Sequence, residues 1–165
     1  MWFSESKRKL QTEEASKTIK LCIIAALVVG SLTANAQTKF SYVNHRVIVP
    51  VMVNGQGPFN FLLDTGTQIT IVDPAMVGLM HLSRPVGRAF VGGIGVKDAA
   101  VGGYTTVDSI ELDSHKLLRA NVVLFDVAKS QGGQSVKVVG ILGQNFLEYF
   151  NVVIRYKDST VKLNP

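Results

Sequence analysis

Residues 61–72 read FLLDTGTQITIV, an apolar segment that contains a single carboxylate, Asp64. A charged group inside a protein core is costly unless it is paired or used. Short apolar runs are typical of buried strands, and the continuous apolar character on either side of the DTG triplet favours strands that are covered on both faces. The segment therefore predicts a buried strand that ends at Asp64 and presents its carboxylate there.

The chain after Phe40 consists mainly of short β-branched runs separated by turn residues. The run 47–53 ends in Asn54-Gly55, a strong signal for a tight turn, and we expect residues 56–58 to extend that loop. Further strands are expected at 87–91, 104–112, 120–126 and 136–142, with a closing hairpin around 157–159 and short helices at 74–80 and 144–150. This pattern predicts an all-β domain with one or two short helices.

The N-terminal segment has the features of a secretory signal peptide. Lys17 and Lys20 precede an apolar stretch at 21–32, and the small residues at 33–36 end in an A-x-A pattern. The stretch is shorter than the roughly 20 residues that span a bilayer, although an uncleaved anchor is the other interpretation. We expect residues 1–36 to be the signal peptide, and the domain to be exported to the periplasm or outside the cell.

Composition restricts the chemistry of the expected domain, residues 37–165. Cys22, the only cysteine, lies in the apolar leader, so this domain has no disulfide. Basic residues are scattered rather than clustered, which does not favour nucleic acid as a partner. The three histidines have no spacing that suggests a metal site, and no serine stands in a G-x-S-x-G setting. We expect neither a metal nor another cofactor.

The Asp-Thr-Gly triplet at 64–66 has a mechanical interpretation. Glycine permits a sharp turn, and the threonine hydroxyl can bind backbone groups and fix that turn. The carboxylate of Asp64 is then presented at the end of the strand. Two such carboxylates brought together share one proton, so that one can deprotonate a water molecule while the other protonates a carbonyl oxygen.

In this setting the sequence resembles the retropepsin-like aspartic proteases. The family pattern, an apolar strand leading into D-[ST]-G-[AS], corresponds to residues 61–67, and a second family element corresponds to VGILGQNFL at 139–147. The resemblance covers most of residues 40–165 and implies a small closed β-barrel with aspartic endopeptidase activity. It implies Asp64 as the catalytic residue, and it implies an active-site loop supported by Thr65, Gly66, Thr67, Ile141, Leu142 and Gly143. Thr67 departs from the family, which usually has alanine or serine there, and its side chain is expected to crowd the catalytic pair or alter its hydrogen bonds.

The family also has a flap, a mobile hairpin that closes over the substrate. The candidate is the glycine-rich segment 90–96, extended to 102–104, and its substrate-contacting residues are expected to be Gly92, Gly93, Ile94 and Gly95. Glycines there permit hinge motion and main-chain contact with a bound peptide. An ordinary glycine-rich surface loop is the other interpretation.

One carboxylate does not make a catalytic pair, so a second copy of the chain is needed. We expect a homodimer with Asp64 of each copy at the two-fold axis and Thr65 reaching across to the loop of the partner. Residues 37–42 or 160–163 are expected to form part of the interface.

Two other functional classes remain open on the sequence. The first is an exported peptide-binding module that keeps the fold but lacks catalytic activity. The departure of Thr67 from the family pattern is the observation that suggests it. The second is a structural β-domain in which DTG is only a turn, and in that case Asp64 is expected to be deeply buried or salt-bridged. The other carboxylates are interpreted as a helix cap (Asp73), a turn residue (Asp158), a solvated strand face (Asp108, Glu111, Asp113) and the end of an apolar run (Asp126).

Overall fold

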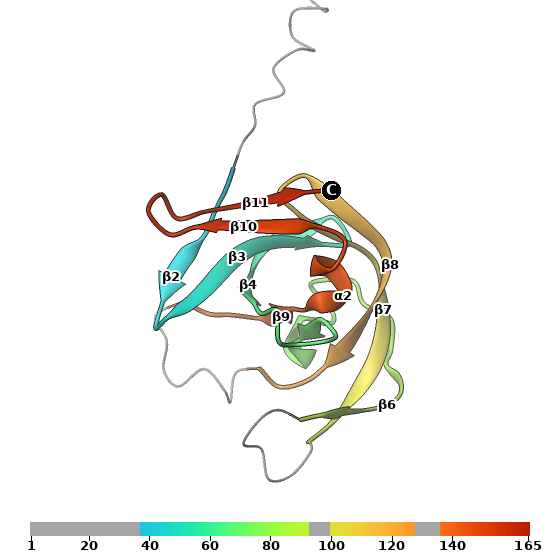
Figure 1. Cartoon of the computed structure of the whole chain (residues 1–165). Helices are drawn as coiled ribbons and strands as arrows, with labels where there is room; N and C mark the ends of the chain where they lie inside the picture. Colours follow the sequence, from blue (N-terminus) through green and yellow to red (C-terminus); the bar gives the residue numbers. More distant parts are fainter. Residues whose placement is uncertain (1–36, 93–99, 128–135) are drawn as a thin grey trace, which may run out of the picture. The chain divides into compact units, whose positions relative to one another are not determined.

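The computed structural model describes residues 37–92, 100–127 and 136–165, all within the second of two units into which the chain divides, residues 37–165 (Figure 1). Its elements follow one another along the chain in a pattern dominated by strands. They are β1 (Thr38–Lys39), β2 (Ser41–Val43), β3 (Arg46–Val53), β4 (Gln56–Leu63), β5 (Ile71–Val72), the 3-10 helix η1 (Pro74–Met76), β6 (Val86–Val91), β7 (Ala100–Leu112), β8 (His115–Leu124), β9 (Gly140–Leu142), the helix α2 (Gln144–Leu147), β10 (Asn151–Arg155) and β11 (Thr160–Asn164).

The larger sheet has the strand order β2-β3-β4-β9-β5-β8-β7-β6. In addition, β3 pairs with β7 through Met52↔Glu111 and Val53↔Ile110, which closes the strands between them into a ring. Most neighbours are antiparallel, but β4 pairs with β9 and β5 pairs with β8 in parallel. The all-β fold expected from the sequence is confirmed.

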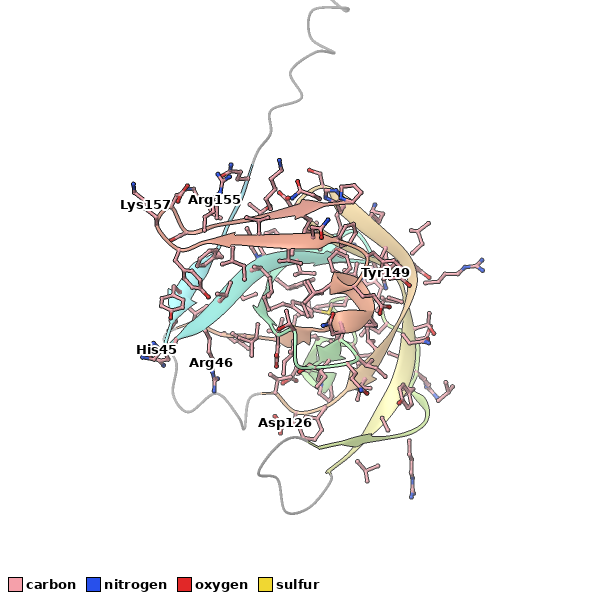
Figure 2. The ribbon with its side chains drawn as sticks, in the orientation of Figure 1. His45, Arg46, Asp126, Tyr149, Arg155 and Lys157 are labelled. Carbon is pink, nitrogen blue, oxygen red and sulfur yellow. The ribbon has the colours of Figure 1, made fainter. Side chains whose placement is uncertain are left out.

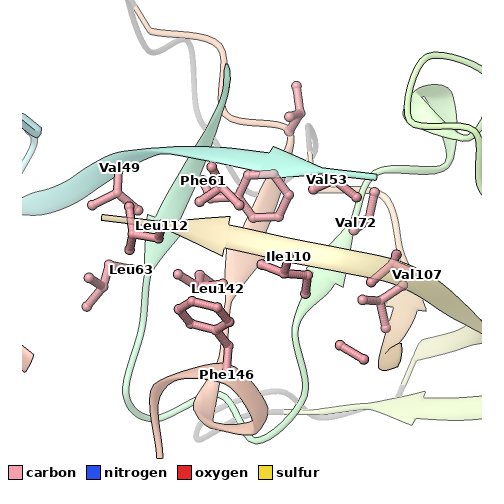
Figure 3. Packing of buried hydrophobic residues seen from close by; sticks show 14 of the residues in the cluster. Val49, Val53, Phe61, Leu63, Val72, Val107, Ile110, Leu112, Leu142 and Phe146 are labelled. Atoms are coloured by element: carbon pink, nitrogen blue, oxygen red, sulfur yellow. The ribbon is translucent and has the colours of Figure 1, made fainter. Parts of the chain in front are cut away.

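The interior of this ring holds the main core (Figure 3). Phe61 and Leu63 of β4 are buried there with Leu142 of β9 and Phe146 of α2. Leu62 points to the opposite face, where it packs against a second apolar cluster. Since both faces of β4 are covered by apolar side chains, the continuous apolar sequence before Asp64 has a structural explanation.

The first hairpin turns more tightly than expected. Asn54 and Gly55 have φ values of 51° and 72°, as a two-residue turn between twisted strands requires, and Gln56 already pairs with Val53. The expectation that residues 56–58 extend the loop is therefore wrong. A register shift between Val51 and Val53 accommodates the pairing.

Both short helices form, but they are shorter than the sequence pattern indicates. Asp73 caps η1, because its carboxylate accepts a hydrogen bond from the N–H of Ala75 at 2.9 Å, as expected for this residue. The regular helix ends at Met76 rather than 80, and α2 ends at Leu147 rather than 150. The start of each helix is therefore where the sequence predicts it, and the end is not.

Several strand boundaries also differ from the sequence-based expectation: β7 begins at Ala100 rather than at 104, and β8 ends at Leu124 rather than at 126. β8 begins at His115 rather than at 120, because Asp113 and Ser114 form a tight turn with φ values of 51° and 64° that joins it directly to β7. β9 is confined to Gly140–Leu142 instead of spanning 136–142.

The terminal sheet, which we define as β1, β11 and β10 in that order, is separate from the ring. Asp113 connects the two, since its carboxylate accepts hydrogen bonds from the Thr38 hydroxyl at 3.0 Å and the Leu163 N–H at 2.8 Å. The interpretation of Asp113 as part of a solvated face is therefore wrong, because both its oxygens have protein partners. Within the described part of the chain, no helix has the length and apolar character needed to cross a membrane.

Candidate active site

Asp64 lies immediately after β4, where that strand runs parallel to β9. Leu63 pairs with Leu142, and the N–H of Asp64 donates to the carbonyl of Leu142 at 3.1 Å. Leu63 and Leu142 are buried, whereas Asp64 is half-buried. Two packed strands therefore hold the backbone of Asp64 while its side chain reaches the boundary of the core.

Both carboxylate oxygens of Asp64 accept hydrogen bonds from its own loop. The N–H of Gly66 donates to Oδ1 at 2.8 Å, and the hydroxyl of Thr67 donates to Oδ2 at 2.8 Å. Hydrogen bonds to a carboxylate are stronger than those between neutral groups. These two bonds fix the orientation of the carboxylate, and the hydroxyl of Thr67 accounts for one of them.

The loop that follows Asp64 is attached to the start of α2. The N–H groups of Gln144 and Asn145 donate to the carbonyls of Thr67 and Gln68, at 2.8 Å and 3.0 Å. Gly143 lies so close to the loop that a Cβ there would be 2.7 Å from the carbonyl oxygen of Thr67. This explains why glycine is needed at the junction of β9 and α2.

The structure thus brings most of the expected active-site residues together. Asp64, Gly66 and Thr67 form one turn, and Leu142 and Gly143 lie directly beside it. Ile141 pairs with Leu62 and Ile71 in the same sheet but belongs to the second apolar cluster. Thr65 is exposed at the tip of the loop.

Sequence reasoning missed the side-chain link between Thr70 and Asn145. The Oδ1 atom of Asn145 accepts hydrogen bonds from both the N–H and the hydroxyl of Thr70, each at 2.8 Å, and its amide nitrogen donates to the carbonyl of Asn121. The Thr70 hydroxyl in turn accepts from the N–H of Gly143 at 3.1 Å. The one available signal was a threonine inside the apolar run ITIV, and Thr70 is fully buried.

Asp64 does not have the features expected of a purely structural turn residue. It is half-buried rather than deeply buried, and the flanking Thr65 and Gly66 are exposed. Among the described residues, Asp64 forms no ion pair; the one pair found there joins Lys116 to Glu111 on the surface. The carboxylate is therefore held in place by neutral donors at an accessible loop.

The strands on either side of the segment expected to form the flap, β6 and β7, pair in antiparallel fashion. β6 and β7 pair through Phe90↔Val101 and Val91↔Ala100, and Gly92 follows β6 as an exposed residue. Gly93, Ile94 and Gly95 lie outside the described residues. Gly102 and Gly103, expected as an extension of the flap, belong to β7 and pair across to β6 and β8.

No cluster of three or more histidine, cysteine, aspartate or glutamate side chains suited to a metal ion occurs among the described residues. The contacts that define the candidate site are those of the Asp64 carboxylate with its two neutral hydrogen-bond donors, Gly66 and Thr67.

Comparison with solved structures gives a fold relative. The crystal structure of a retropepsin-like aspartic protease from Rickettsia conorii aligns with 76% of this chain and 86% of its own, at 15% identity and a TM-score of 0.51. The protease of EIAV complexed with the inhibitor HBY-793 aligns with 66% of this chain and 91% of its own, at 23% identity and a TM-score of 0.48. No curated protein matches the sequence.

At the level of sequence, the family described as "Aspartyl protease" matches residues 49–146. That range begins in β3 and ends in α2, so it includes both Asp64 and the strand β9 beside it. The match covers more than half of the chain, and the fold of the chain is similar to that of the Rickettsia conorii protein. The chain therefore belongs to the aspartyl protease family and has the retropepsin-like fold.

Proposed function

We propose that the protein is an aspartic endopeptidase whose catalytic carboxylate is Asp64. The observation that carries this proposal is the geometry of that side chain. Its backbone is held by two buried strands, both oxygens accept hydrogen bonds from Gly66 and Thr67, and the adjacent Thr65 is exposed. A fixed, accessible carboxylate at the end of a rigid strand is suited to general acid–base chemistry.

The second carboxylate of the proposed mechanism comes from a second copy of the chain. In a symmetric homodimer, Asp64 of each copy meets its counterpart at the two-fold axis, and the two share one proton. Thr65, exposed at the loop tip, then reaches the loop of the partner. No metal or other cofactor takes part.

The reaction proceeds without a covalent enzyme intermediate. The ionised carboxylate removes a proton from water as the water oxygen attacks the peptide carbonyl carbon, and the protonated carboxyl group donates its proton to the carbonyl oxygen. The resulting tetrahedral species carries two hydroxyl groups on the former carbonyl carbon. As it collapses, one of these hydroxyl groups returns its proton to a carboxylate. The amide nitrogen receives a proton, the C–N bond breaks, and a new amine and a new carboxylic acid leave.

The proposed substrate is an extended peptide, bound as an added strand beneath the β6–β7 hairpin. Leu62, Ile69 and Ile141 are half-buried apolar residues in the segments around Asp64. They favour apolar side chains next to the bond that is cut. We also propose that residues 1–36 direct export of the domain, so that the substrates are periplasmic or extracellular.

The direct test is Asp64→Asn, which retains the shape of the side chain and an acceptor for the Gly66 N–H. Cleavage of a mixed peptide library, measured by mass spectrometry across pH 3–8, is expected to be lost in the variant while its circular dichroism stays unchanged. If the purified variant cleaves peptides as fast as the wild type does, Asp64 is not the catalytic residue. A wild-type protein that binds library peptides at every pH without cutting them is instead a binding module.

A further inference from the structure

The terminal sheet has two faces of different character. In β11, Val161 and Leu163 are buried in the main core. Their partners in β10 are Ile154 and Val152, which also pack on that core. Successive residues of a strand point to opposite faces, and directly paired residues share a face. The residues between these apolar ones therefore lie on the other face, which we call the outer face.

The outer face carries three cations. Lys39 of β1 and Arg155 of β10 both pair with Thr160 of β11, which places them in one row across the sheet. Two residues further along β11, Lys162 pairs with Val153. Lys39 and Arg155 are exposed, Lys162 is half-buried and Val153 is 38% exposed. The last outer pair consists of two asparagines, so these rows hold positive charge and no carboxylate.

The hairpin between β10 and β11 extends this basic character. Lys157 is exposed in the turn, and the ammonium group of Lys39 donates to the carbonyl of Asp158 at 2.8 Å, which holds it at the same end of the sheet. Figure 2 shows Arg155 and Lys157 at this hairpin end. Asp158 is the one acidic residue in the three strands and their hairpin, against four lysine and arginine residues. Positive charge therefore dominates this part of the surface.

Two exposed tyrosines lie beside the cations. Tyr156, which follows Arg155 in the chain, is 59% exposed, and Tyr42 of β2 is 50% exposed. Their rings pack edge to face with centroids 5.3 Å apart, and Tyr156 also contacts Phe40. A tyrosine combines an apolar ring with a polar hydroxyl, and exposed tyrosines next to basic residues are typical of protein surfaces at a membrane–water interface.

We propose that the outer face binds the anionic headgroups of a phospholipid membrane surface, with Lys39, Arg155 and Lys162 as the principal contacts. Charge complementarity is the main argument, because clustered lysine and arginine side chains are attracted to anionic lipid. Lipid binding by this face is an additional function, and it does not depend on the peptidase proposal.

The place of β1 in the chain supports a lipid partner. This strand follows closely on the apolar stretch 21–32, for which an uncleaved membrane anchor is the alternative to a signal peptide. If that stretch is retained in a membrane, only a short length of chain separates β1 from the lipid surface. The outer face is then within reach of the headgroups.

A second copy of the chain is the less favoured occupant, because two cationic faces repel each other when they meet. Nucleic acid is the other anionic candidate. The sequence alone did not indicate a basic surface, since Lys39, Arg155 and Lys162 lie on three different strands. Only the pairing register of the terminal sheet brings them together.

Vesicle co-sedimentation of the full chain tests the proposal. One set of vesicles contains equal amounts of phosphatidylglycerol and phosphatidylcholine, and the other contains phosphatidylcholine alone. The ratio of the two binding constants reports the preference for anionic lipid, since the apolar stretch 21–32 can contribute to both. We expect a clear preference in the wild type, which disappears at 1 M salt because the Debye length is then only about 3 Å.

Removal of the three cations should abolish most of this preference. Each cation close to an anionic surface contributes about fivefold, so the triple variant Lys39→Gln, Arg155→Gln and Lys162→Gln should lower the ratio about a hundredfold. The matched control is a second triple variant that removes the same charge from exposed residues outside the terminal sheet. It combines Arg84→Gln, Arg88→Gln and Arg119→Gln, and it should retain most of the preference.

A local probe shows which face meets the lipid. Val153→Cys in a Cys22→Ser background, labelled with an environment-sensitive fluorophore, should change its emission on anionic vesicles. The same label at Leu118→Cys, on β8 and 66% exposed in the wild type, should not respond. Because Cys22 is the only native cysteine, each label reports one position, whatever the leader contributes to binding.

The outcomes separate the possible occupants. No preference for anionic vesicles, an unchanged ratio in the triple variant at the outer face, or a silent label at residue 153 overturns the proposal. A single-stranded oligonucleotide that displaces the protein from vesicles at lower concentration than soluble phosphatidylglycerol would assign the face to nucleic acid instead. A change of oligomeric state in that triple variant, seen by sedimentation velocity without a change in vesicle binding, would assign it to a second copy. Loss of peptide cleavage in Asp64→Asn decides the proposed function separately.

Discussion

At the scale of single residues, Thr67 gives the Asp64 turn its particular character. The sequence led us to expect that its branched side chain would crowd the catalytic pair or alter its hydrogen bonds. In the structure its hydroxyl donates to Oδ2 of Asp64 at 2.8 Å, while the N–H of Gly66 donates to Oδ1. The hydroxyl of Thr67 therefore orients the carboxylate.

Replacing this hydroxyl tests its role as a positioning group. Thr67→Val keeps the shape of the side chain but removes the donor, and a hydrogen bond to a charged group contributes about 1.5–3 kcal/mol. If the bond matters for orienting Asp64, kcat should fall about tenfold or more while KM stays close to that of the wild type. Steady-state cleavage of one library-derived peptide measures both constants.

The conservative variant Thr67→Ser retains the hydroxyl and is the matched control. It should recover most of the wild-type kcat. Equal activity of the valine and wild-type proteins would mean that the bond from Thr67 to Asp64 does not position the carboxylate for catalysis.

At the scale of elements, the junction between β9 and α2 holds the active-site loop. Gly143 accepts no side chain without displacing the loop, because a Cβ there would lie 2.7 Å from the Thr67 carbonyl oxygen and 2.9 Å from the carbonyl carbon of Ile69. The neighbouring Gly140 is similarly enclosed by Phe61 and Ile71. Two glycines thus allow β4, β5 and β9 to approach closely beside Asp64.

Gly143→Ala is therefore expected to destabilise the fold. Overpacking of a tightly enclosed position costs about 1–3 kcal/mol, and a shift of the loop should lower peptide cleavage as well. Urea denaturation followed by far-UV circular dichroism gives the free energy of unfolding.

Gly78→Ala is the control for this substitution, since a Cβ at Gly78 meets nothing within 4 Å. It is expected to leave the free energy of unfolding within about 0.5 kcal/mol of the wild type, as surface substitutions usually do. Similar stabilities of the two alanine variants would show that the loop yields easily at Gly143.

At the scale of the whole molecule, the proposed mechanism makes activity a property of pairs of chains. Each chain supplies one Asp64, so a dimer that contains one Asp64→Asn copy holds a single catalytic carboxylate and should be inactive. Mixing the two proteins should therefore lower the activity by more than dilution of the wild-type protein alone.

If equal amounts of wild-type and Asp64→Asn chains exchange freely, about one quarter of the dimers keep both carboxylates. The cleavage rate per wild-type chain should then fall to about half of its unmixed value. A rate per wild-type chain that is unaffected by the variant, under conditions in which subunits exchange, would mean that a single chain carries out catalysis alone.

Much of the architecture could be predicted from local sequence patterns. Alternating β-branched runs and turn residues indicated an all-β domain, and the apolar run before Asp64 indicated a buried strand with the carboxylate at its end. Asp73-Pro74 located the start of η1. These features depend on neighbouring residues, whose conformational preferences and periodicity can be read along the chain.

The extent of elements was less predictable, because tertiary contacts decide it. The loop after Asn54 is shorter than expected because Gln56 pairs with Val53, and α2 ends early at Leu147. The interpretation of Asp113 failed for a related reason. Its partners, Thr38 and Leu163, lie at the two ends of the domain sequence.

By itself, the sequence determined which strand is buried and that Asp64 stands at its end, since burial and turn chemistry are encoded by residues that are adjacent in the chain. Only the tertiary structure decided what lies beside that carboxylate. The parallel pairing of β4 with β9 and the link from Thr70 to Asn145 both join segments that are distant in sequence. Burial of both faces of β4 requires apolar partners from elsewhere in the chain, and no local pattern specifies which segments will supply them.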